Sequence, residues 1–141
     1  MTITKESEKI LNNIINILYG ACHAPNCKHI SKRKCPISCG CRTERKFKLN
    51  TETAMCWEIA NQIYNILRFS RPTKQDVQKV ISIADSSMML SQYHMTRGWH
   101  SFFSTIFRLL QMILVDQMSF YVSRDLSSLK RSLPRLKREP K

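Results

Sequence analysis

Glycine is scarce in this chain, and the usual signatures of enzyme active sites are absent. Only three glycines occur in 141 residues, so there is no glycine-rich loop of the kind that cradles phosphates. The chain also has no G-x-S-x-G nucleophile elbow and no H-E-x-x-H metalloprotease motif. The ten acidic residues form no evident pair of the kind that general acid–base catalysis uses. We therefore expect a protein that is not an enzyme.

Neither a secretory signal nor an uninterrupted membrane-spanning run is visible. The first nine residues mix both charge signs and lack an apolar run before a small-residue cleavage site. The most apolar stretch, 99–122, contains Arg108 and Asp116, which are costly inside a bilayer. We expect no membrane insertion and an intracellular location, in the nucleus or cytoplasm or both. In such a compartment cysteines stay reduced or bind metal.

Positive charge is concentrated in two segments. The net charge is +13, from 23 basic and 10 acidic residues. Residues 21–50 hold eight bases against the single acid Glu44, a local net charge of +7, and residues 123–141 hold seven bases against two acids, or +5. Such segments suit the phosphates of RNA or DNA, and the second also fits a nuclear localisation signal. The residues that we expect to contact nucleic acid are Lys28, Lys32, Arg33, Lys34, Arg42, Arg45, Lys46, Lys48, Lys130, Arg131, Arg135, Lys137 and Arg138.

Five of the six cysteines fall between residues 22 and 41 of the same basic segment. Thiolates and imidazoles are the ligands that tetrahedral zinc prefers. The segment has no helical periodicity, so a bound zinc ion would supply the free energy that orders it. Disulfides and buried thiols without metal are the alternatives. The first-choice ligands are Cys22, Cys27, Cys35 and Cys39, with Cys41 or His29 as the substitute.

The interval Cys27-x7-Cys35 resembles the opening of the Cys-Cys-Cys-His motif in the zinc-binding transcription factors of pneumoviruses and filoviruses. The layout is also similar to the cysteine-rich silencing suppressors of plant RNA viruses. The closing x3-His is missing after Cys39 and Cys41. The resemblance implies a viral accessory protein that regulates transcription or silencing and binds RNA in preference to DNA.

Apolar periodicity predicts helices over 5–19, 51–69, 73–93 and 99–122. Gly20, Pro72 and Gly98 are expected to end the first three, and Pro134 to end any helix in the tail. The last fifteen or so residues look unable to bury themselves. The predicted fold is mainly α, with a small zinc-stapled cysteine-rich module packed on an approximately four-helix bundle. The predicted divisions are 1–50 for the first helix and the module, 51–122 for the helical domain, and 123–141 for a partly disordered basic tail.

Aromatic and methionine residues are dense after residue 88. The simplest interpretation is a core, although methionine also suits adaptable partner-binding surfaces. Cys56 is expected to be a small core residue on the second helix. The side chains that would form a partner surface or a homodimer contact are Trp99, Phe102, Phe103 and Met112.

These features predict a non-enzymatic, zinc-binding regulatory protein that binds nucleic acid largely through the phosphate backbone. The alternative is a zinc-stabilised helical adaptor that engages a cellular protein. A secreted helical factor with disulfide bonds is the third possibility.

Overall fold

The computed structural model describes residues 2–22, 51–69, 71–91, 97–115 and 120–138, and these residues fold into five α-helices. The helices are α1 (Lys5–Cys22), α3 (Thr51–Phe69), α4 (Lys74–Ser91), α5 (Arg97–Leu114) and α6 (Phe120–Arg138). The extended backbone in these ranges pairs only in an isolated bridge between Thr2 and Thr73. The expectation of a mainly helical protein is therefore confirmed.

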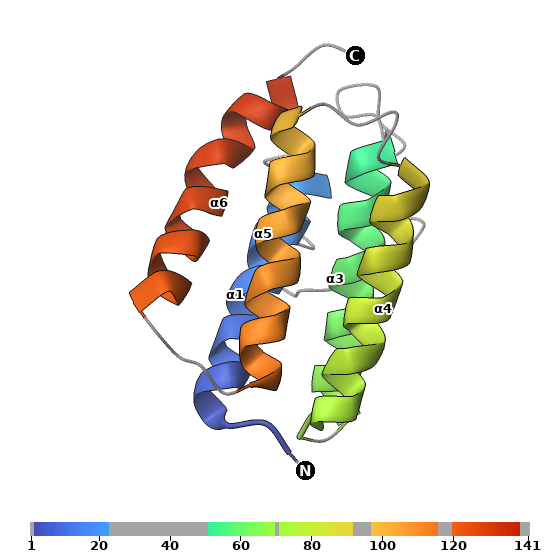
Figure 1. Cartoon of the computed structure of the whole chain (residues 1–141), viewed down its shortest axis with the longest axis vertical. Coiled ribbons are helices and arrows are strands. Elements are labelled where there is room, and N and C mark those ends of the chain that lie inside the picture. The colour runs from blue at the N-terminus through green and yellow to red at the C-terminus, as the bar shows by residue number, and fades with distance from the viewer. Residues whose placement is uncertain (1, 23–50, 70, 92–96, 116–119, 139–141) are drawn as a thin grey trace.

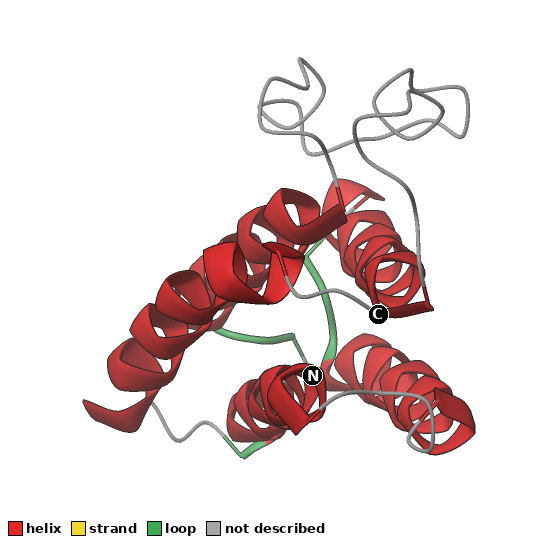
Figure 2. Cartoon of the chain, turned by 90° about the horizontal axis from the view of Figure 1, so that it is seen from above, coloured by secondary structure: helices red, strands yellow, loops and turns green. Residues whose placement is uncertain are grey.

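The five helices form a closed ring in which successive helices run in opposite directions (Figure 1). α1 packs against α3, α3 against α4, α4 against α5 and α5 against α6, and α6 returns to contact α1. Figure 2 shows the same helices placed around a common interior. All five contribute to one cluster of buried apolar side chains. The described helices of the three predicted divisions, 1–50, 51–122 and 123–141, therefore share one core.

α1 forms because the sequence supplies a capping residue before the helix and apolar residues at helical spacing within it. The backbone N–H of Ser7 donates to the Oγ1 of Thr4 at 3.1 Å, which satisfies one of the open donors at the start of the helix. Leu11 and Leu18, seven residues apart, lie on the face that is fully buried. This face anchors α1 between α3 and α6.

The predicted end of the first helix at Gly20 is wrong, because α1 continues to Cys22. A Cβ at Gly20 would lie 3.4 Å from the Cδ2 of Leu133 on α6, which is an ordinary van der Waals distance. The last turn of α1 therefore lies in contact range of α6.

Hydrogen bonds from Ile3 and within the first turn of α4 hold residues 72 and 73 before α4. α3 ends before Arg71-Pro72, where the proline disfavours helical geometry in the preceding residue. The N–H of Ile3 donates to the carbonyl of Pro72 at 2.9 Å. The N–H of Asp76 donates to the Oγ1 of Thr73 at 3.1 Å, and the N–H of Thr73 donates to the Oδ2 of Asp76 at 2.9 Å. This reciprocal cap fixes the start of α4 at Lys74.

The single helix expected over 99–122 is also wrong. α5 ends at Leu114 and α6 begins at Phe120. Arg108 of α5 and Asp125 of α6 approach within 2.9 Å, whereas one straight helix would separate residues 17 positions apart by about 25 Å. The chain folds back because both helices carry apolar faces that bury against the same core.

α6 continues through Pro134 to Arg138, so the predicted stop before this proline is wrong. Leu129 and Leu136 are each only 2% exposed. Burial of the two leucines is worth about 2 kcal/mol each, which offsets the cost of about 3 kcal/mol for proline inside a helix. The expectation that the last fifteen or so residues are unable to bury themselves is therefore wrong for Leu129 and Leu136.

The rings of Trp99, Phe102 and Phe103 on α5 pack together inside the core. Phe102 lies edge-on to Trp99, with ring centroids 5.4 Å apart, and Phe103 stacks on Trp99 at 5.9 Å.

None of the described helices is both long and apolar enough to cross a bilayer.

Candidate functional site

Most of the predicted zinc ligands lie outside the described residues. They are Cys27, His29, Cys35, Cys39 and Cys41. Cys22 is the exception, since it is the last residue of α1. In the part of the chain that the structure describes, no three His, Cys, Asp or Glu residues are grouped as metal ligands. The zinc site remains a prediction.

The first basic segment also lies outside the described residues, from Lys28 to Lys48. The structure does place the two residues that precede and follow residues 23–50. Cys22 ends α1 and Thr51 begins α3, and α6 ends at the same end of the helical ring (Figure 1). The close approach of Gly20 to Leu133 joins the last turns of α1 to the C-terminal half of α6. Residues 23–50 are thus attached at the end of the ring where α6 finishes.

The outer face of α6 carries the basic residues predicted in the tail. Lys130, Arg131 and Arg135 are exposed, and so is Arg124. Positions 124, 131 and 135 are seven and four residues apart, so they fall along one side of the helix over about 16 Å. Lys137 and Arg138 belong to the last turn of α6, and their side chains are not described.

The one acid of α6 is directed into the protein. The side chain of Asp125 is only 5% exposed, and the guanidinium of Arg108 binds both its oxygens, with Nε–Oδ2 at 3.0 Å and Nη2–Oδ1 at 2.9 Å. The hydrogen bonds that Arg108 donates to Asp125 raise the pKa of Arg108 above its ordinary value, which favours the charged guanidinium. The solvent face of α6 is therefore basic and free of carboxylates over its described side chains.

Sequence reasoning missed the Arg108–Asp125 pair. The signal that could have indicated it is the helical spacing of Val122, Asp125 and Leu129, all of which are buried. An acid in register with two buried apolar residues needs a cationic partner, because burying an unpaired carboxylate is costly.

The predicted partner surface is largely internal in this structure. Trp99, Phe102 and Phe103 are 2, 3 and 1% exposed. Met112 is partly buried against the same cluster. The core interpretation thus accounts for the three rings. Cys56 is fully buried, as expected of a small core residue.

No protein-family model, curated protein or solved structure matches this chain. A functional proposal therefore depends on the residues and on their placement.

Proposed function

We propose that this protein is a non-enzymatic, zinc-stabilised regulator that binds nucleic acid through the phosphate backbone. RNA is the first ligand to test. The observation that carries the proposal is the basic, acid-free outer face of α6, which ends where residues 23–50 join the helices. Phosphates bind Lys and Arg at fixed positions, and a rigid helix fixes them well.

Charge placement supports a single phosphate-binding end. Residues 21–50 carry a net charge of +7 and residues 123–141 carry +5, so +12 of the total +13 belongs to two segments, and the first is attached at the end of the ring where α6 finishes. Two separate basic surfaces would have been expected if α6 ended at the opposite end of the ring. The adjacency favours one ligand that contacts both segments.

Zinc is the proposed cofactor of residues 22–41. The set Cys22, Cys27, Cys35 and Cys39 would give a closed four-thiolate site, which is the structural rather than the catalytic type. Because Cys22 ends α1, a metal bound there would couple the basic segment to the helical core. Zinc would then hold the basic residues in place without taking part in any reaction.

Binding to a single-stranded RNA tests the role of α6. We expect Lys130→Gln/Arg131→Gln/Arg135→Gln to weaken binding by at least about tenfold at moderate salt, since each phosphate contact contributes by counterion release. The matched control is Lys5→Gln/Lys9→Gln/Lys79→Gln, which removes the same charge from exposed positions of α1 and α4. Equal losses in both variants would show that net charge alone drives binding.

Native mass spectrometry of the full chain tests the zinc site. We expect a mass increase that corresponds to one zinc ion, and its loss in Cys35→Ser/Cys39→Ser. Cys56→Ser is the matched control, because this cysteine is buried in the helical core. A wild-type chain without bound metal after purification with zinc present would refute this part of the proposal.

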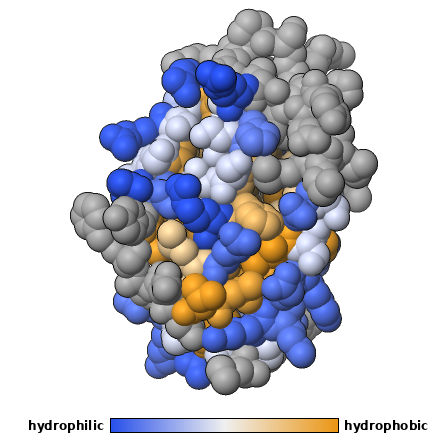
Figure 3. Space-filling model, in the orientation of Figure 1, coloured by the Kyte–Doolittle hydropathy of each residue, from blue (hydrophilic) through white to orange (hydrophobic). Residues whose placement is uncertain are grey.

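A protein-interaction adaptor is the second candidate, and an apolar surface at the end of α5 favours it. Val115 is 60% exposed, and it lines a cavity of about 420 Å³ with Met112, Leu114, Arg108 and Gln111. Figure 3 shows apolar surface over the C-terminal half of α5. A partner that is lost with Val115→Glu and retained with the α6 triple variant would support the adaptor.

A further inference from the structure

The exposed side of α6 has cations along both edges and neutral residues between them. An α-helix turns by about 100° per residue, so the consecutive residues Lys130 and Arg131 point about 100° apart around its axis. Arg135, four residues after Arg131, lies within about 40° of it, on the side away from the lysine. Ser127 and Pro134 fall inside the interval between the two edges. All five side chains are exposed, so a neutral strip separates a lysine edge from an arginine edge.

The two edges are far enough apart to reach different strands of a duplex. A helix with its side chains is about 10–12 Å across, so cations at opposite edges are separated by about this distance. α5 and α1 pack against the other side of α6, which lies at the outside of the ring (Figure 1). A groove of a duplex has phosphates on both sides, whereas a single strand supplies only one row of them.

The exposed side of α6 is poorly suited to reading unpaired bases. Proteins bind single strands by stacking bases on aromatic rings, and Asn or Gln commonly reads adenine. None of these side chains is among the exposed, described ones of α6. The strip instead carries the hydroxyl of Ser127, which can both donate and accept a hydrogen bond. Duplex RNA is recognised by shape and by contacts to 2′-hydroxyls and phosphates across its wide, shallow minor groove.

We propose that α6 binds double-stranded RNA across the minor groove. Lys130 contacts the phosphates of one strand, and Arg131 and Arg135 contact those of the other. Ser127 and Pro134 lie over the floor of the groove. The inference rests on the nucleic-acid binding proposed above and names the form of its ligand. The minor groove of B-DNA is only about 6 Å wide and does not admit a helix, so this arrangement selects RNA.

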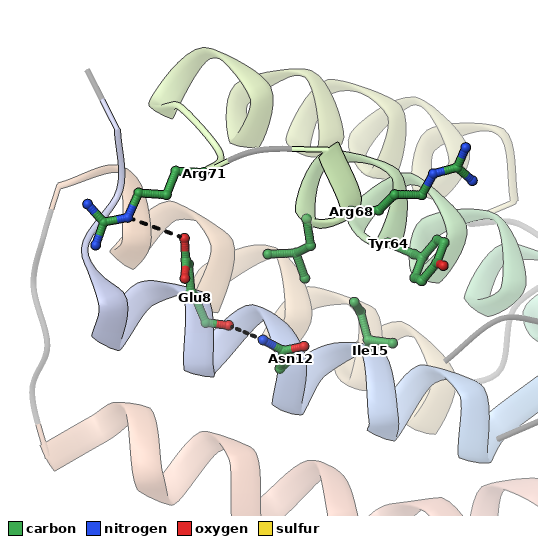
Figure 4. Close-up of a pocket in the computed structure, with 7 residues that line it drawn as sticks. Glu8, Asn12, Ile15, Tyr64, Arg68 and Arg71 are labelled. Atoms are coloured by element: carbon green, nitrogen blue, oxygen red, sulfur yellow. Dashed lines mark hydrogen bonds and ion pairs between the residues drawn. The ribbon is translucent and has the colours of Figure 1, made fainter. Parts of the chain in front are cut away.

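Another surface lined by arginines lacks this arrangement and supplies a control. A groove of about 510 Å³ lies between α1 and α3, and Arg71 there reaches Glu8, with Nε–Oε1 at 3.9 Å (Figure 4). The carboxylate of Glu8 repels a phosphate at this position. Arg71→Gln therefore removes one exposed positive charge without changing α6.

Comparison of three ligands tests the form of the nucleic acid with the full chain. They are an RNA duplex of about 20 base pairs, one of its strands without self-complementarity, and the DNA duplex of the same sequence. We expect the RNA duplex to bind at least about tenfold more tightly than either of the others at moderate salt. Equal or tighter binding of the single strand or of the DNA duplex would overturn this inference and leave the proposed function intact. Binding of none of the three would refute both.

Ser127→Trp tests whether the neutral strip enters a groove, because it adds bulk without changing the charge. It should weaken binding of the RNA duplex by at least about tenfold, and it should leave single-strand binding unchanged or increase it, since a tryptophan ring stacks on unpaired bases. Ser101→Trp, at an exposed position of α5, is the matched control. An unchanged unfolding midpoint shows that the variant is folded. Undiminished duplex binding by this folded variant would overturn the proposal.

Single substitutions at the two edges test contact with both strands. Lys130→Gln and Arg131→Gln should each weaken binding of the RNA duplex by a few-fold, because each removes a phosphate contact, and Arg71→Gln should not. A loss at one edge alone would show that α6 follows a single strand, which contradicts binding across the groove.

Discussion

At the scale of single residues, the Arg108–Asp125 pair is the clearest example of a side chain whose role depends on the fold. Asp125 is buried, while the Arg108 side chain is 53% exposed, so only the arginine has water available to solvate its charge. The arginine can be solvated if its partner is lost. The aspartate cannot.

This asymmetry predicts the effect of Arg108→Met. We expect a loss of about 2 kcal/mol in the free energy of unfolding, below the range for fully buried pairs because the guanidinium is half exposed. The double variant Arg108→Met/Asp125→Leu should recover most of this loss, since both polar groups are then replaced by apolar ones. Denaturant unfolding at neutral pH measures both. A double variant as unstable as the single one would contradict the explanation.

The cap of α4 contributes to the stability of the fold in a pH-dependent way. The backbone hydrogen bond from Thr73 lowers the pKa of Asp76 below its ordinary value of 3.8. A carboxyl with a lowered folded-state pKa stabilises the fold above its unfolded-state pKa, and this contribution is lost as the pH falls through the folded-state value.

We therefore expect Asp76→Asn to be less stable than wild type near neutral pH, with a difference that shrinks below about pH 4. Unfolding curves recorded from about pH 3 to pH 7 measure this difference. Thr73→Ala removes the other half of the cap and should cost about 1 kcal/mol. A stability difference for Asp76→Asn that did not change with pH would argue against the charged cap.

At the scale of helices, the sequence predicts helix boundaries best where the apolar periodicity stops next to a residue that ends helices. The span of α3 was predicted over 51–69 and is observed there, because Pro72 follows its last apolar residues. The break between α5 and α6 could not be predicted in this way, since residues 115–119 contain neither glycine nor proline. Pairing of α6 with α5 and α1 is a tertiary effect, and neither local propensity nor spacing reports it.

Pro134 gives a test of how α6 is stabilised. The residue is exposed within the helix, where it removes one backbone hydrogen bond. We expect Pro134→Ala to raise the free energy of unfolding by about 3 kcal/mol, because the alanine restores this bond and removes the cost of proline inside the helix. Leu136→Ala should lower it by about 2–4 kcal/mol, because it leaves a cavity. Thermal or denaturant unfolding measures both. A neutral Leu136→Ala would contradict the docking of the last turns of α6.

At the scale of the whole molecule, the placement of charge is the feature on which the proposed function depends. The sequence alone locates the two basic segments and the cysteines between 22 and 41. It could not locate the two segments relative to each other, because the ring that brings the end of α6 to the end of α1 is set by packing across the core. The predicted zinc ligands and the first basic segment remain predictions, since residues 23–50 lie outside the described ranges.

The salt dependence of RNA affinity tests most directly whether both segments contact one ligand. For single strands the logarithm of the affinity falls with the logarithm of the salt concentration by about 0.7 for each phosphate contact. Lys32→Gln/Arg33→Gln/Lys34→Gln and Lys130→Gln/Arg131→Gln/Arg135→Gln should each reduce the wild-type slope by about 2, and the combined variant by about 4. Slopes that are unchanged by the α6 substitutions, or a wild-type affinity that is insensitive to salt, would contradict the shared phosphate-binding end.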